Sequence, residues 1–333
     1  MKKVLFLIII SLLSLSAVAQ THKDTLIVDR AGRGDFRNIQ DAIEQVRAFD
    51  PAGQVVIFIR SGVYKEKLVL HTYITNVKLV GEDRDNTIIT YDDHANIPTP
   101  AGSGSTNGKL GTFRSYTFMI RGNDITLENL TIENAALQLG QAVALHIEGD
   151  RVLVRNCKLL GNQDTIYTGR ENCRQIFVDC HIEGTTDFIF GPSTAWFERC
   201  DILCKRNSFI TAASTPQNIE YGYIFNNCKI SVTSNVDKML LGRPWRQYAM
   251  TLFMNCELPK EIAPAGWNNW SKPENEKTAR YMEYNNSGEG ANTKYRVSWS
   301  KILTKKEAAK YTLQNVMGEW KVAIESGKLK VEN

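Results

Sequence analysis

The feature that most constrains the fold is a short pattern that recurs six times between residues 127 and 258. The aligned copies read LENLTI, VRNCKL, FVDCHI, FERCDI, FNNCKI and FMNCEL. Their fourth column holds Leu130, Cys157, Cys180, Cys200, Cys228 and Cys256, at spacings of 27, 23, 20, 28 and 28 residues. In every copy an apolar residue stands two positions after this column and three positions before it. Three apolar columns in six copies indicate a structural repeat.

The columns predict strands separated by a bend. The cysteine column and the column two residues later lie on one face of a strand, whereas the column three residues earlier has the wrong parity for that face. The residues just before the cysteine column are Asn129, Asn156, Asp179, Arg199, Asn227 and Asn255. Asn and Asp tolerate the left-handed conformation that such a bend can need. Repeats of 20–28 residues without an intervening helix indicate an all-β parallel solenoid, because a propeller blade needs about 40–45 residues.

The ends of such a solenoid expose unpaired strand edges and need covers. Residues 35–49 carry apolar residues at helical spacing, which predicts a helix that caps the N-terminal end. At the other end, Thr304 and Glu307 form a capping-box pattern that opens a helical stretch over residues 303–320. Residues 259–300 are rich in Pro, Asn, Gly and Glu and are predicted to form long loops. We expect residues 20–333 to form a single domain.

The first nineteen residues have the composition of an export signal. A lysine pair precedes the apolar run VLFLIIISLLSL, and AVA supplies a cleavage site. The apolar run is short for a bilayer span, so we expect cleavage of residues 1–19 and export to the periplasm or beyond. The formal charge of 40 − 36 = +4 is too small to argue for nucleic-acid binding, and the five scattered histidines lack the spacing of a zinc site.

The seven cysteines of an exported chain would ordinarily suggest disulfides. The repeat, however, places five of them in one column of the solenoid interior. We therefore expect free thiols that act as small apolar side chains, with one disulfide inside the column as the alternative.

Two aspartates share a phase in this repeat. Asp164 and Asp187 each head a short apolar run, and each lies seven positions after a cysteine of the column, Cys157 or Cys180. Residues at one phase in successive coils stack about 4.8 Å apart. The sequence therefore predicts two neighbouring carboxylates on one face.

Carboxamides and a guanidinium are predicted to flank this pair. Gln163 and Thr186 form the adjacent column, and Gln141 heads a similar run, QAVAL, one coil earlier. In LGRPW, the Leu-Gly echoes the Phe-Gly of DFIFG on a later coil, which directs Arg243 and Trp245 toward the same face. An arginine can keep one aspartate ionised while the other stays protonated as an acid, and carboxamide N–H groups can stabilise an oxyanion. Register alone leaves open a purely structural ladder of Asp and Asn side chains.

Six motifs make the sequence similar to a known family. GVYKEK, GTFRSYTF, QAVAL, GNQDTIY, TDFIFG and LGRPW follow one another in the order found in the pectin methylesterases, and the resemblance runs from about residue 24 to about residue 320. It implies a right-handed parallel β-helix and a carboxylic ester hydrolase that removes methyl esters from the galacturonate units of pectin and releases methanol. No cofactor, no metal and a monomeric state are expected.

The resemblance also implies roles for individual residues. Asp187 would be the nucleophile, and Gln141 and Gln163 would hold the developing oxyanion. Asp164 would protonate the departing methanol and then deprotonate the water that cleaves the acyl-enzyme, while Arg243 would orient Asp187. The substrate contacts it implies come from Trp245, Thr112, Tyr167 and Phe190; packing is the alternative for Tyr167 and Phe190.

Three other functions remain open at this point. Two aspartates about 5 Å apart also suit a retaining glycosidase, and a β-helix lyase could act on the same polymer, although the glutamines favour acyl chemistry. A carbohydrate-binding or adhesion solenoid is a second alternative, because residues 33–35 read Arg-Gly-Asp. The third is a divergent esterase of the same fold that acts on another ester.

Overall fold

The structure is a computed structural model that describes residues 24–50, 53–100, 103–105, 107–325 and 328–331. The predicted signal peptide, residues 1–19, lies outside the described residues. Within these ranges no helix has the length and apolar character needed to cross a membrane.

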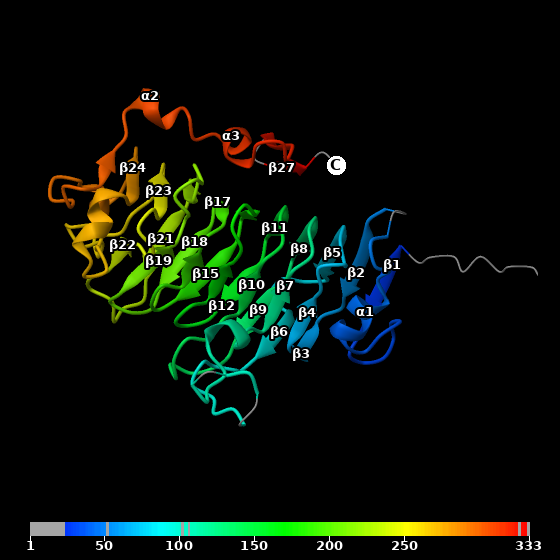
Figure 1. Cartoon of the computed structure of the whole chain (residues 1–333). Coiled ribbons are helices and arrows are strands. Elements are labelled where there is room, and N and C mark those ends of the chain that lie inside the picture. Colours follow the sequence, from blue (N-terminus) through cyan, green and yellow to red (C-terminus); the bar gives the residue numbers. More distant parts are fainter. Residues whose placement is uncertain (1–23, 51–52, 101–102, 106, 326–327, 332–333) are drawn as a thin grey trace, which may run out of the picture.

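The described chain winds into a parallel β-helix built of three sheets (Figure 1). Sheet A has eleven strands in the order β1 (Thr25–Val28), β2 (Val55–Ile59), β5 (Val77–Gly81), β8 (Ile125–Glu128), β11 (Val152–Arg155), β14 (Arg174–Val178), β17 (Thr194–Glu198), β20 (Tyr223–Asn226), β23 (Met250–Met254), β24 (Arg280–Tyr284) and β25 (Lys301–Ile302). Sheet B holds β3 (Gly62–Lys65), β6 (Thr87–Tyr91), β9 (Thr131–Asn134), β12 (Lys158–Leu160), β15 (His181–Gly184), β18 (Asp201–Cys204) and β21 (Lys229–Val232). Sheet C holds β4 (Leu68–Leu70), β7 (Phe118–Ile120), β10 (Leu145–Ile147), β13 (Ile166–Thr168), β16 (Ile189–Gly191), β19 (Phe209–Ala213) and β22 (Leu240–Gly242). The predicted solenoid fold is thereby confirmed.

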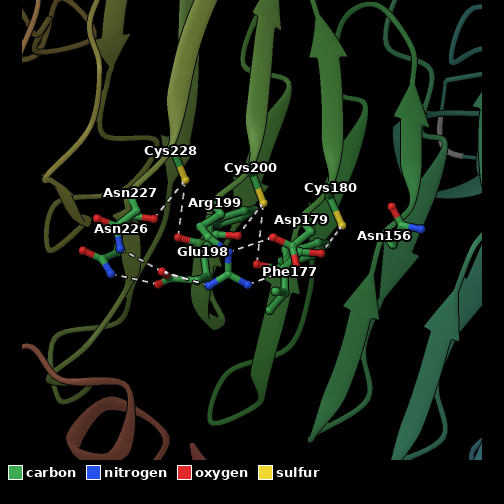
Figure 2. Close-up of polar contacts among 12 residues, drawn as sticks. Asn156, Phe177, Asp179, Cys180, Glu198, Arg199, Cys200, Asn226, Asn227 and Cys228 are labelled. Carbon is green, nitrogen blue, oxygen red and sulfur yellow. Dashed lines mark hydrogen bonds and ion pairs between the residues drawn. The ribbon is translucent and has the colours of Figure 1, made fainter. Parts of the chain in front are cut away.

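The predicted bend lies at the corner between sheets A and B. All six residues of the Asn-rich column adopt a left-handed backbone, with φ between 48° and 55°. The side chains of this corner bond from coil to coil: Asn156 Nδ2 donates to Asn129 Oδ1 at 2.7 Å. Where the column holds an arginine, Arg199 instead donates to both carboxylate oxygens of Asp179, at 2.8 and 3.0 Å (Figure 2). The polar side chains of this corner thus hydrogen-bond to one another, while the next residue of each repeat points into the core.

The residues that turn inward build the core. The five cysteines of the column are buried, and all seven cysteines of the chain are free thiols. On the sheet A side, Phe177, Phe197, Phe225 and Phe253 stack with ring centroids 4.7, 4.4 and 4.3 Å apart. The prediction of free core thiols is therefore confirmed.

This burial predicts the outcome of thiol titration. In the folded protein we expect none of the seven thiols to react with dithionitrobenzoate within minutes, because burial denies access and raises the pKa of the column thiols Cys157, Cys180, Cys200 and Cys228. In denaturant without reductant, all seven should react. A denatured count of five would instead reveal one disulfide.

The N-terminal end is capped as predicted. Helix α1 (Ile39–Gln45) buries Ile39, Ala42 and Ile43 against the first coils. The carboxylate of Glu66 accepts the N–H groups of Ile39 and Gln40 at 3.0 and 3.1 Å. It thereby satisfies two of the donors that a helix N-terminus leaves unpaired.

The C-terminal segment corrects the prediction. The capping box exists, since Glu307 Oε2 accepts the N–H of Thr304 and Thr304 Oγ1 accepts the N–H of Glu307. The segment, however, forms two short helices, α2 (Lys305–Ala308) and α3 (Leu313–Met317), which do not cover the end. They run back over the outer face of sheet A (Figure 1), followed by the hairpin β26 (Val322–Glu325) and β27 (Lys328–Val331).

The outer face of sheet A explains this path. It carries apolar side chains on successive coils, and the returning segment buries its own apolar side chains against them. The sheet contributes Ile176, Trp196, Ile224 and Leu252, and the segment contributes Leu313, Val316, Met317 and Trp320. Residues 259–300 form mainly loops and turns, as predicted. Strand β24 and the 3₁₀ turns Pro273–Lys277 and Glu289–Ala291 were not predicted.

Candidate active site

The candidate site lies on the outer face of sheet C. Strands β10, β13 and β16 pair in parallel, with Leu145 opposite Ile166 and Ile166 opposite Ile189. Asp164 and Asp187 each stand two residues before one of these paired isoleucines, so they occupy one phase on adjacent coils. Both have a left-handed backbone, with φ of 67° and 48°, at the corner where the chain enters sheet C. The structure therefore brings together the two aspartates that the repeat aligned.

Arg243 binds one aspartate of the pair. Its Nε and Nη2 donate to the two carboxylate oxygens of Asp187, at 2.9 and 2.6 Å. The predicted register of LGRPW was wrong by two residues. Gly242 pairs with Thr211, and Thr211 pairs with Ile189. Residues 241–242 therefore lie in register with residues 188–189, whereas the sequence had aligned them with residues 190–191. A shift of two preserves the face of a strand, and Arg243 therefore still reaches the site.

The two carboxyl groups differ in their surroundings. Asp164 is 7% exposed and Asp187 is 6% exposed. Burial, and then the charge of Asp187, raise the pKa of Asp164 well above its ordinary value, with Arg243 opposing the change. Burial also raises the pKa of Asp187, but the hydrogen bonds and charge of Arg243 counteract it. Asp187 is thus the group favoured as a carboxylate, and Asp164 the group favoured as an acid.

A cleft of about 250 Å³ opens above this pair. Gln141 and Gln163 line it together with the two aspartates and Arg243. The main chains of the two glutamine segments are joined, because the Ala142 N–H donates to the Gln163 carbonyl at 3.0 Å. Within the described part of the chain, no side-chain hydrogen bond engages either carboxamide. Their N–H groups can therefore serve a bound ligand.

The predicted sugar contacts are only partly brought together. Thr112, Phe190 and Trp245 line the cleft. Tyr167 is not among these lining residues: its ring packs 4.9 Å from Phe190, 4.9 Å from Phe113 and 4.7 Å from His146. Tyr167 therefore supports the wall of the cleft from the neighbouring coil. Its contact with substrate stays a prediction.

Three further lining residues were missed by the sequence analysis. Phe113 follows Thr112 directly, and Ala212 is the in-register partner of Phe190, so both could have been found from the motifs and the register. Trp270 comes from the loop before the turn Pro273–Lys277 and belongs to no repeat. Across the described ranges, no group of three or more His, Cys, Asp or Glu side chains is placed to hold a metal ion.

Comparison with known proteins gives a consistent result. The family model described as Pectinesterase matches residues 25–319. Pectinesterase 31 from Arabidopsis thaliana is 35% identical over 289 residues, which cover 85% of this chain and 89% of that protein. Two longer relatives, named probable pectinesterase/pectinesterase inhibitors, are matched over only 51% and 53% of their lengths.

Solved structures agree in fold. Pectin methylesterase from carrot is 31% identical with a TM-score of 0.78, over 88% of this chain and 92% of that chain. A pectin methylesterase in complex with a hexasaccharide is 30% identical with a TM-score of 0.76, over 89% of this chain and 97% of that chain.

Proposed function

The chain belongs to the pectinesterase family of carboxylic ester hydrolases, and from this premise we propose that it hydrolyses the methyl esters of pectin and releases methanol. The observation that carries the proposal is the buried pair of aspartates on adjacent coils, one of them gripped by Arg243, below a cleft with two unengaged carboxamides. The predicted signal peptide supports action outside the cytoplasm.

The proposed reaction has two halves. The Asp187 carboxylate attacks the ester carbonyl at C6 of a galacturonate unit, and the oxyanion that forms is held by the carboxamides of Gln141 and Gln163. As the tetrahedral intermediate collapses, the C–O bond to the methoxy group breaks and Asp164 protonates the leaving oxygen, so that methanol departs. Asp164, now ionised, takes a proton from water. That water attacks the acyl group, which releases the free galacturonate and restores Asp187.

The surroundings of the two aspartates suit these starting states. The raised pKa of Asp164 supports a protonated acid, and the bidentate contact with Arg243 supports an ionised nucleophile. Activity should rise with pH as Asp187 loses its proton and fall as Asp164 loses its own. The substrate would lie along the cleft wall formed by Thr112 and Trp245, and the hexasaccharide complex of a relative supports a polymeric sugar ligand.

The function is tested by product analysis with methyl-esterified pectin. The proposal predicts methanol and free acid in equal amounts, with no new reducing ends and no unsaturated sugars. Reducing ends would favour the glycosidase, and unsaturated products the lyase. Hydrolysis of other esters without methanol release from pectin would favour the divergent esterase.

Arg243→Lys is expected to lower kcat about tenfold to a hundredfold, because one charge-assisted hydrogen bond and the fork geometry are lost. Steady-state methanol release measures the change. Arg199→Lys is a matched control, since Arg199 makes the same two-bond contact with Asp179 at the A–B corner, away from the cleft. If both variants keep wild-type kcat, Arg243 does not orient the nucleophile.

Asp164→Asn should raise the free energy of unfolding near neutral pH. Folding raises the pKa of Asp164, so between the unfolded and the folded pKa the folded chain holds a proton that the unfolded chain has lost. The free energy of unfolding of the wild type therefore falls as pH rises through this range. Asparagine avoids this loss. Denaturant unfolding of both proteins should show no difference below about pH 4 and a more stable variant near pH 8. Equal stability at both pH values would contradict the raised pKa.

A further inference from the structure

Two aromatic rings pack against the guanidinium of Arg243. Its central carbon lies 4.1 Å from the ring centroid of Phe209 and 3.8 Å from that of Trp270. One edge of the same group makes the two hydrogen bonds to Asp187. Stacking leaves the in-plane N–H groups of a guanidinium available for hydrogen bonds, so the rings and the carboxylate use different parts of the group.

Phe209 touches both members of this ion pair. It is the first residue of β19, and its main-chain carbonyl accepts the N–H of Asp187 at 2.9 Å. Its ring lies against the guanidinium that binds the Asp187 carboxylate. A single residue thus binds the backbone of Asp187 and packs against the side chain of its partner, Arg243.

Trp270 is tied to the strand that carries Arg243. The Asn268 N–H donates to the Gly242 carbonyl at 3.1 Å, and Asn268 Oδ1 accepts the Trp270 N–H at 2.7 Å. Trp270 itself has a left-handed backbone, with φ of 63°. The loop is therefore anchored one residue before Arg243, and its indole ring lies against the guanidinium.

We propose that Phe209 and Trp270 are positioning residues, which clamp the Arg243 guanidinium so that its fork holds Asp187 in the geometry of attack. The proposal rests on the proposed role of Asp187. A free arginine side chain loses rotamer entropy when it is fixed, and a clamp formed before substrate binds removes that cost from the reaction. A desolvated cation–aromatic contact adds further attraction.

The two rings are distinguishable because only one of them faces the substrate. Trp270 lines the cleft, and Phe209 is not among the described residues that line it. Replacing the Phe209 ring is therefore expected to act through Arg243 rather than through direct contact with the substrate. Replacing Trp270 removes the clamp and a cleft wall together.

The test compares Phe209→Leu with Phe209→Tyr, and Trp270→Leu with Trp270→Phe, in methanol release from methyl-esterified pectin. Phe209→Leu should lower kcat about tenfold with KM within about twofold of wild type, and Phe209→Tyr should restore kcat. Trp270→Leu should lower kcat and also raise KM, and Trp270→Phe should restore most of kcat.

The pH profile separates positioning from stability. The charged and titratable groups that interact with the Asp187–Arg243 pair are Asp164 on the adjacent coil and the buried Tyr281. The contact with Arg243 lowers the pKa of Asp187 against burial. Loosening the guanidinium should therefore move the acid limb of the kcat profile of Phe209→Leu to higher pH, and Phe209→Tyr should return it.

Phe58→Leu is the matched control, because the Phe58 ring lies 5.7 Å from the guanidinium carbon of Arg60, which pairs with Glu82, the residue after β5. It should leave kcat and the pH profile unchanged. The proposal is overturned if Phe209→Leu folds and keeps wild-type kcat and acid limb, or if Phe209→Tyr fails to restore them. Failure of the proposed function would look different, since the wild-type protein would then release no methanol from methyl-esterified pectin. An error in the role of Asp187 alone would leave Asp187→Asn active.

Discussion

Asp187→Asn is expected to lower methanol release by about 10⁴-fold or more. The amide has nearly the shape of the carboxylate and tolerates the left-handed backbone at this position, where φ is 48°. It lacks the charge and the nucleophilic oxygen, however, so that the first half of the reaction has no attacking group. Initial rates of methanol release with saturating methyl-esterified pectin measure the effect.

The control for this variant is Asp179→Asn. Asp179 also has a left-handed backbone, with φ of 54°, and also accepts two hydrogen bonds from an arginine. It lies at the A–B corner, so its replacement should leave turnover within about twofold of wild type. Should Asp187→Asn retain a tenth of wild-type activity, the nucleophile has been assigned to the wrong residue.

Asp164→Asn is expected to lower kcat about 10²- to 10⁴-fold, the usual contribution of a positioned general acid–base group. Asparagine has no proton to give to the departing methoxide. It also has no carboxylate to take the proton of the attacking water. Substrate binding should change little, because the neutral acid and the amide are alike in size and charge. The measurement is kcat and KM for methanol release.

The pH dependence gives this prediction a second readout. Wild-type kcat should fall at high pH as Asp164 loses its proton, whereas the residual activity of Asp164→Asn should lack that limb. A variant with near-normal kcat, or one that keeps the alkaline limb, would remove Asp164 from the role of acid and base.

The repeat columns were sufficient to predict the coils and the meeting of Asp164 with Asp187. Both follow from strand periodicity, and an insertion elsewhere in a coil leaves the phase of a column unchanged. The register of LGRPW could not be fixed in the same way, because strand lengths in sheet C vary, from three residues in β16 to five in β19. The face was nevertheless right, since the error was an even number of residues.

Other features depend on surfaces that exist only after folding. The return of residues 303–325 over sheet A requires the apolar outer face of six strands, including Trp196 and Leu252, to be assembled first. Trp270 comes from a loop without periodicity, and nothing in its local sequence indicates that it stacks on Arg243. Tyr167 has the spacing of a cleft residue, but its ring packs against those of Phe113 and Phe190.

The Arg-Gly-Asp triplet has a structural explanation. Asp35 Oδ2 accepts the N–H of Ile27 at 2.8 Å, and Arg33 pairs with Asp29 at 2.8 Å. The two charged ends of the triplet are thus engaged by the first coil of the solenoid. These contacts give the triplet a role within the fold.

The chemical identity of the nucleophile is tested most directly by trapping the intermediate during turnover. Borohydride reduces an aspartyl anhydride irreversibly to homoserine, so the product accumulates even when the acyl-enzyme is short-lived. Tryptic digestion should yield the peptide of residues 175–199, which carries Asp187 and the control Asp179. We predict substrate-dependent conversion of Asp187 alone, in step with loss of activity. Continued methanol release with Asp187 unmodified, or conversion of Asp164 instead, would contradict the account.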